Sequence, residues 1–221
     1  MSAPVITLTV VTFQGWPSEA LDFYEGLEAD NTKTYWLANK KTYETCVLEP
    51  MQELMSELEP EYGEGRIFRP YRDVRFSKDK APYKTAIAGV ISTVYIQVSA
   101  QGLACGGGMH YMAPDQLDRY RKAVDSDACA ALTNVVEGVR AHGIDVHGHE
   151  VLKSAPRGYR ADHPQIELLR CKGLIAWKQW DVEPWLGTAA ARDRITEFAV
   201  AARPLNDWMD EHVGESTLPP R

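Results

Sequence analysis

The hydrophobic pattern of the N-terminal third of the chain is mainly helical. A stripe of apolar residues follows Pro17, a residue type suited to the first turn of a helix, and the stripe stops near Asp30. A second stripe covers Thr34–Leu58 and is crossed by Pro50, where we expect a kink or a restart because proline has no N–H donor. Ahead of both helices, Val5–Thr12 is rich in β-branched residues and predicts a strand or an ordered arm.

The period of the pattern changes from helical to alternating after Lys84. Ala86–Ser92 and Thr93–Ala100 predict strands, and the second has valine and isoleucine at every other position. The glycine run Gly106–Gly108 predicts a tight turn after them. The remaining elements that we expect are a helix from Pro114, a helix over Ala128–His142, a strand over Gly148–Lys153, a helix over Pro164–Cys171, a strand over Leu174–Trp180 and a helix over Thr188–His212 that Pro204 interrupts.

The order of these elements indicates the fold class. Helices come first, strands follow, and helices and strands are mixed thereafter, which is typical of an α+β protein and not of a regularly alternating parallel sheet. We therefore expect a single domain over residues 1–213, with a mostly antiparallel central sheet flanked by helices. Residues 214–221 are expected to form a disordered tail.

Composition adds the broad class of protein. The 221 residues are 44% hydrophobic and 25% charged, which are ordinary values for a globular protein with a sizeable core. No apolar stretch approaches the roughly 20 residues that span a bilayer, and the N-terminus lacks the basic start of a signal peptide. We expect a soluble cytoplasmic protein without a membrane partner. Its four cysteines are scattered, which favours small buried residues in a reducing compartment over a disulfide pair.

Charge is distributed unevenly along the chain. The formal net charge is −7, yet the basic segment Arg66–Lys84 holds seven basic and two acidic residues, so its own balance is 7 − 2 = +5 and the rest carries −7 − 5 = −12. An acidic chain is poorly suited to bind nucleic acid over its whole surface, because such binding depends on neutralising phosphates. The seven basic residues are Arg66, Arg69, Arg72, Arg75, Lys78, Lys80 and Lys84.

The spacing of these cations predicts an anion site. Five of them recur every third residue, and because Pro70 and Pro82 oppose a helix, we expect an irregular extended segment with the cations along one side. Guanidinium groups form forked hydrogen bonds with carboxylates and phosphates. An anionic small molecule is thus the expected ligand, and no cofactor or oligomeric state is indicated. The predicted ligand-binding residues are Arg69, Arg72, Arg75, Lys80, Tyr83 and Lys84, with the glycine turn at Gly107 and the loop residue Arg157 as walls.

Two other interpretations of the basic segment stay open. In the first, Asp73 and Asp79 pair with the cations and the segment is a structural clasp, which would fix geometry more than it adds stability. In the second, the segment docks an acidic protein or single-stranded nucleic acid and has no catalytic role. If the protein is an enzyme, Asp73 or Asp79 would orient or activate a group while the arginines stabilise developing negative charge.

A histidine cluster is a separate candidate for metal binding. His147 and His149 would share one face of a strand, and two imidazoles with a nearby carboxylate can hold zinc or iron. The alternative is a polar loop whose histidines are hydrated.

The basic segment also carries a resemblance to a known family. The run Arg69-x-x-Arg72-Asp73-x-Arg75-Phe76-x-x-Asp79-Lys80-x-x-Tyr83 is similar to the signature of a bacterial and fungal family, the domain of unknown function 2461 family. The chain departs from that family at Asp30-Asn31, where relatives tend to have paired amides. The resemblance implies no particular reaction. It extends over Phe13, Leu21, Trp36, Tyr43, Gly106–Met109, Pro156–Tyr159, His163-Pro164 and Pro204-Leu205.

Overall fold

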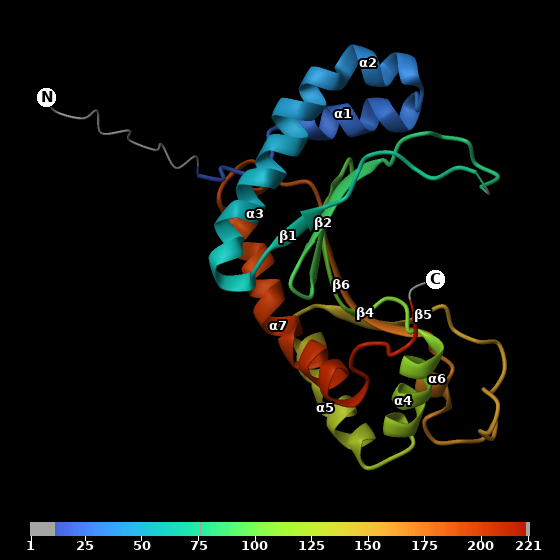
Figure 1. Ribbon diagram of the computed structural model, residues 1–221. Helices are drawn as coiled ribbons and strands as arrows, with labels where there is room; N and C mark the ends of the chain where they lie inside the picture. The colour runs from blue at the N-terminus through green and yellow to red at the C-terminus, as the bar shows by residue number, and fades with distance from the viewer. Residues whose placement is uncertain (1–11, 76, 220–221) are drawn as a thin grey trace, which may run out of the picture. The chain divides into compact units, whose positions relative to one another are not determined.

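The computed structural model describes residues 12–75 and 77–219, and its elements have the expected α+β class (Figure 1). The strands form an antiparallel sheet of six strands in the order β1-β2-β3-β4-β6-β5. The strand expected at Val5–Thr12 lies almost wholly outside the described residues. The strands are β1 (Gly65–Ile67), β2 (Ala86–Ile91), β3 (Val94–Ser99), β4 (Gly102–Met109), β5 (Asp145–His149) and β6 (Gly173–Trp180).

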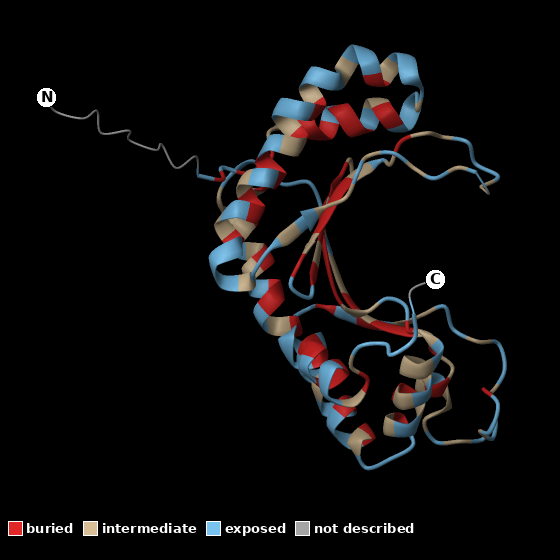
Figure 2. Cartoon of the chain, in the orientation of Figure 1, coloured by how far each residue is buried: buried red, intermediate tan, exposed pale blue. Residues whose placement is uncertain are grey.

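The chain divides into two compact units. The first unit comprises Met1–Ser92, Val98–Gly102 and Val182–Asp193. Its core is rich in aromatic side chains from α1 and α2, among them Phe23, Tyr24 and Trp36, and Figure 2 shows the buried stripe along α1. Its helices are α1 (Ser18–Ala29), α2 (Lys33–Thr42), the π-helical η1 (Tyr43–Leu48), α3 (Glu49–Tyr62) and the 3-10 helix η2 (Pro184–Gly187).

The helix expected over Thr34–Leu58 contains a π-helical turn directly before Pro50. The segments α2, η1 and α3 follow one another without a break, and Pro50 lies in the first turn of α3. A proline in the interior of a regular helix removes one hydrogen bond and clashes with the carbonyl four residues earlier. The wider turn of η1 is the local adjustment at the position where the sequence predicts a kink.

The second unit comprises Thr93–Gln97, Leu103–Asp181 and Arg194–Arg221. The helix expected from Thr188 to His212 is a single helix, and the predicted interruption at Pro204 is wrong because α7 continues through that proline. Leu205, Trp208 and Met209, just beyond Pro204, are buried, so packing keeps the helix regular there. The helices of this unit are α4 (Pro114–Val124), α5 (Ala128–Ala141), α6 (Ile166–Leu169) and α7 (Ala190–His212), whose first turn belongs to the first unit.

The predicted glycine turn at Gly106–Gly108 is also wrong, because these residues lie within strand β4. Gly106 is paired with Trp177 of β6, and a Cβ atom on Gly106 would lie 3.2 Å from that indole ring. A Cβ atom on Gly107 would lie 3.5 Å from Ala202 and Asn206 of α7. Glycine inside a strand marks a close approach of neighbouring groups. The run is therefore accounted for by packing on both faces of β4.

Strand β5 occupies Asp145–His149, whereas the sequence predicts a strand over Gly148–Lys153. The strand ends where Glu150 adopts a φ of 47°, a left-handed conformation that a strand cannot accommodate. The polar residues at the start of β5 hide its pattern, because only Val146 is fully buried.

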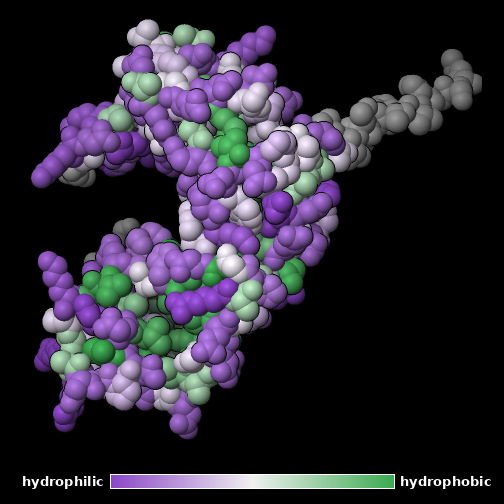
Figure 3. Space-filling model, turned by 180° about the vertical axis from the view of Figure 1, so that it is seen from behind, coloured by the Kyte–Doolittle hydropathy of each residue, from purple (hydrophilic) through white to green (hydrophobic). Residues whose placement is uncertain are grey.

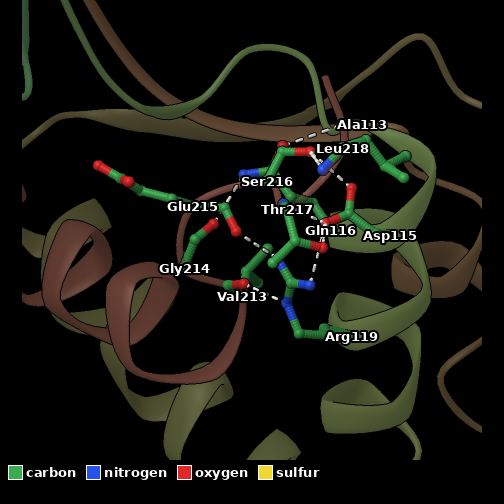
Figure 4. A network of polar contacts seen from close by, with 10 residues as sticks. All are labelled: Ala113, Asp115, Gln116, Arg119, Val213, Gly214, Glu215, Ser216, Thr217 and Leu218. Atoms are coloured by element: carbon green, nitrogen blue, oxygen red, sulfur yellow. Dashed lines mark hydrogen bonds and ion pairs between the residues drawn. The ribbon is translucent and has the colours of Figure 1, made fainter. Parts of the chain in front are cut away.

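Residues 213–218, most of which belong to the stretch expected to be disordered, lie against the first turns of α4 (Figure 4). Arg119 donates to the carbonyl oxygens of Val213 (2.5 Å) and Glu215 (2.6 Å). The Asp115 carboxylate accepts hydrogen bonds from the backbone N–H of Thr217 (2.8 Å) and the hydroxyl of Ser216 (2.7 Å). These contacts form a polar network that fixes the end of α7 to α4.

Candidate functional site

The basic segment forms a loop that is closed at its base. Tyr71 and Tyr83 form an isolated antiparallel bridge, and the N–H of Arg72 donates to the carbonyl of Pro82 (2.9 Å). The segment is irregular and not helical, as predicted, but the chain reverses direction within it, so the expected single extended run is wrong. A repeat of three does not distinguish an extended run from a loop. We call residues 72–82 the basic loop.

Neutral contacts anchor this loop to the first unit. The Tyr83 ring is stacked on Trp36 of α2, with centroids 4.3 Å apart and planes inclined by 6°. The Asn31 side chain accepts from the N–H of Tyr83 (3.1 Å) and donates to its carbonyl (3.0 Å). Burial raises the pKa of the Tyr83 hydroxyl. Tyr83, which the sequence predicts as a ligand-binding residue, thus holds the base of the loop through its ring and its backbone.

Each acid of the basic loop is paired with an arginine of the same loop. Asp79 pairs with Arg72, and Asp73 accepts from the Arg75 guanidinium at 2.6 and 2.9 Å. The Arg75 hydrogen bonds lower the pKa of Asp73, whereas the backbone N–H of Ala81, followed by Arg72, lowers the pKa of Asp79. Both carboxylates are thus held ionised. They are better suited to orient cations than to deliver a proton.

The other cations of the segment have no acidic partner among the described residues. Lys80 donates to the carbonyl of Val74 (2.9 Å), and Arg66 and Lys84 lie over the Phe68 ring at 4.9 and 5.5 Å. Arg69 and Lys78 are exposed. Five of the seven cations therefore keep an uncompensated charge: Arg66, Arg69, Lys78, Lys80 and Lys84.

The surface of the basic loop is open to solvent. Figure 3, in which the loop protrudes on the left, shows a mainly hydrophilic surface there. The Arg75 side chain is 77% exposed, whereas that of Arg72 is 31% exposed. Phe76, at the centre of the signature, lies outside the described residues. An anion bound here would contact the tips of several cationic side chains.

The two residues predicted as walls of this site lie in the second unit. Gly107 is in the middle of β4 and faces α7, and Arg157 is an exposed residue of the turn in which the Tyr159 N–H donates to the Pro156 carbonyl (3.1 Å). Their participation in a site with the basic loop stays a prediction.

His147 and His149 both lie on β5, two residues apart and therefore on one face of the strand, as the sequence predicts. His147 is paired with Asp145 (Nδ1 to Oδ2, 2.7 Å), whereas His149 is stacked on His110, with ring centroids 3.8 Å apart. In the described part of the chain, no three histidine, cysteine, aspartate or glutamate side chains are grouped so that they could hold a metal ion. The sequence analysis did not identify His110 as the partner of His149. His110 directly follows β4, which is the neighbour of β6 in the sheet, and a histidine at the end of a strand is the signal that could have indicated this contact.

Comparison with known proteins gives the family of the chain. No curated protein and no solved structure matches it. Over the ranges 12–75 and 77–219, no helix has both the length and the apolar character needed to cross a membrane. A family model described as "Conserved hypothetical protein (DUF2461)" matches residues 19–208, which include the whole basic segment. The chain therefore belongs to the domain of unknown function 2461 family.

Proposed function

We propose that the basic loop and the adjacent residues Arg69 and Lys84 bind a ligand that bears phosphate or carboxylate groups. The observation that supports this most strongly is the imbalance of charge. Two acids each engage one arginine, and five cations of the same segment have no acidic partner among the described residues. Like charges gathered in one segment of the chain repel one another and create a local positive potential that attracts an anion.

The two ion pairs of the loop do not support the interpretation of the basic segment as a structural clasp. Asp73 and Arg75 are two residues apart, and Asp79 and Arg72 are seven apart, so both pairs lie within the loop itself. Exposed pairs of this kind contribute about 0–1 kcal/mol to stability. Asn31 and Trp36 join the base of the loop to the helices through neutral contacts with Tyr83. Anchoring of the base therefore does not depend on the two ion pairs.

The internal pairs instead prearrange the arginines for binding. Asp73 and Asp79 fix the orientation of the Arg75 and Arg72 guanidinium groups, and each guanidinium has five N–H donors. A phosphate or carboxylate would bind the Arg72 guanidinium together with Arg69, Lys78 and Lys80. The bound anion would lower the repulsion within the loop. The function proposed here is binding, with Asp73 and Asp79 as positioning residues.

The test is a binding experiment with pyrophosphate and citrate on a variant that removes only uncompensated charge. The double variant Arg69→Gln/Lys78→Gln leaves both internal ion pairs intact and should weaken calorimetrically measured binding about tenfold or more, equivalent to about 1.4 kcal/mol. The control Lys41→Gln/Lys122→Gln removes the same net charge from exposed positions on α2 and α4 and should bind as the wild type does.

A second pair of variants separates binding from a structural role. Arg72→Ala and Arg75→Ala should leave the thermal unfolding of the ligand-free protein within a few degrees of wild type and abolish stabilisation by pyrophosphate. Unfolding of both variants at room temperature would instead support the clasp. Binding of a single-stranded oligonucleotide with a steep logarithmic salt dependence, and none of pyrophosphate or citrate, would replace the small anion by nucleic acid as the partner.

A further inference from the structure

The strands of the second unit have two faces of different character. On one face, four residues are at most 1% exposed: Leu103, Cys105, Val146 and Ala176. Figure 1 shows α4, α5 and the end of α7 on one side of these strands, and Gly107 faces Ala202 of α7. We call the other face the open face. It comprises Tyr95 and Gln97 of β3, Gly106 and Gly108 of β4, Ile175 and Trp177 of β6, and Asp145 and His147 of β5.

Two aromatic rings form the centre of the open face. Tyr95 and Trp177 are half-buried, and their ring centroids lie 6.1 Å apart with planes inclined by 33°. Gly106 lies between them, since a Cβ atom there would be 3.2 Å from the Trp177 ring and 3.6 Å from the Cβ of Tyr95. Any larger residue at this position would displace the indole. The absence of a side chain at Gly106 therefore leaves room for the half-buried Trp177 ring close to β4.

Polar groups surround these rings. Asp145 is directly opposite Trp177 in the pairing of β5 with β6, and His147 is opposite Ile175. Directly opposite side chains in an antiparallel pair lie about 5 Å apart at Cβ, so the carboxylate borders the indole. The Tyr95 hydroxyl donates to the Oε1 atom of Gln97 (2.8 Å), which leaves the Nε2 amide group of Gln97 as a donor.

The Asp145–His147 pair adds an imidazole of defined orientation. The contact between Asp145 Oδ2 and His147 Nδ1 (2.7 Å) fixes the orientation of the imidazole. The Nε2 atom is left to form a hydrogen bond with a ligand hydroxyl, and the His147 side chain is 44% exposed. The pair is thus a hydrogen-bonding group next to the aromatic centre.

Charge selects the class of ligand. The open face contains one carboxylate, Asp145, and no lysine or arginine, because Lys178 lies opposite Cys105 on the other face and donates to the carbonyl of His142 (3.0 Å). A phosphate would find no cation here. A neutral ring with several hydroxyl groups would stack on the indole and exchange hydrogen bonds with carboxylate, imidazole and amide groups.

We propose that the open face is a binding site for the ring of a neutral carbohydrate, which stacks on Trp177 and bonds through its hydroxyl groups to Asp145, His147 and Gln97. The site is separate from the basic loop in residues and in ligand chemistry. The proposal therefore stands or falls independently of the anion site.

An array of neutral and anionic glycans, followed by calorimetry with the glycan retained most strongly, tests this proposal. The wild-type protein should retain neutral glycans, and Trp177→Leu should weaken their binding about tenfold or more, equivalent to about 1.4 kcal/mol, because the ring on which the sugar stacks is removed. Trp180→Leu is the matched control, because Trp180 is on the same strand and opposite Leu103 on the buried face. It should bind as the wild type does.

A second variant guards against misfolding of Trp177→Leu. His147→Ala changes an exposed residue of β5, the strand at the end of the sheet, and should also weaken glycan binding while the far-UV spectrum and unfolding midpoint stay unchanged. Arg69→Gln/Lys78→Gln should retain neutral glycans fully. Failure of the wild type to retain any neutral glycan, or equal binding by Trp177→Leu and wild type, would overturn the proposal.

Discussion

At the scale of single residues, two side chains and two glycines define the two candidate sites. The side-chain amide of Asn31 forms hydrogen bonds with both the backbone N–H and the backbone carbonyl of Tyr83. The Trp36 ring is stacked on the ring of the same tyrosine. In the second unit, Gly106 makes room for an indole and Gly108 for a carbonyl. The residue type at each of these four positions is explained by shape or hydrogen bonding, and none of the four residues is charged.

Gly108 offers a direct test of this role. Its φ is +83°, and a Cβ atom would lie 2.4 Å from the backbone oxygen of Leu174, which cannot move away without breaking the β4–β6 pairing. Gly108→Ala should therefore lower the free energy of unfolding by about 2 kcal/mol or more. Gly138→Ala is the control, since Gly138 is exposed in α5 with open space around it, and it should raise the same free energy by about 0.5–1 kcal/mol. Urea denaturation measures both, and a neutral Gly108→Ala would contradict the argument.

At the scale of elements, regular hydrophobic patterns predict the structure well. The apolar stripe after Pro17 is confirmed as α1, and the alternation after Lys84 is confirmed as β2 and β3. Strand β4 was missed because its glycines have no side chains to form a pattern. The fold of the basic segment was missed because its closure depends on Tyr71, Tyr83 and the distant Asn31. Local spacing contains no information on such contacts.

The network between α4 and the end of the chain predicts a dependence on pH. The backbone N–H of Thr217, followed by Ser216 and Arg119, holds the pKa of Asp115 well below its ordinary value. A carboxyl group with a lowered folded-state pKa contributes stability that is present above its unfolded pKa of about 3.9 and is lost as the pH falls through the folded pKa. Amide exchange at Thr217 should therefore accelerate as the pH is lowered below about 4, once corrected for the intrinsic pH dependence of exchange.

Two variants isolate the contribution of Asp115 to that network. Asp115→Asn should exchange faster at neutral pH and lose the acid-dependent step. Asp118→Asn, an exposed carboxylate of the same helix, should behave as the wild type does. An acid-dependent step of the same size in Asp115→Asn would assign it to another group.

At the scale of the whole molecule, the chain separates two kinds of surface chemistry. The basic segment carries +5 in a chain of net charge −7, whereas the open face of the second unit has one carboxylate, Asp145, beside the rings of Tyr95 and Trp177. Under the two proposals made above, an anion binds to the first surface and a polyhydroxyl ring to the second. The family assignment covers both units, because the matched residues 19–208 include the basic segment and strands β1 to β6.

The reactivity of the cysteine thiols measures whether both units are folded. All four are free: Cys105, Cys129 and Cys171 are buried in the second unit, whereas Cys46 is half-buried in η1 of the first. Burial raises the pKa of the three buried thiols, and a protonated thiol in the core does not react, because the thiolate is the nucleophile. A native protein should therefore release one equivalent of chromophore from an aromatic disulfide reagent within minutes and four equivalents in denaturant. Cys46→Ser should abolish the rapid equivalent and leave the slow ones. Rapid reaction of further thiols in that variant would mean that the second unit opens on the time scale of the assay.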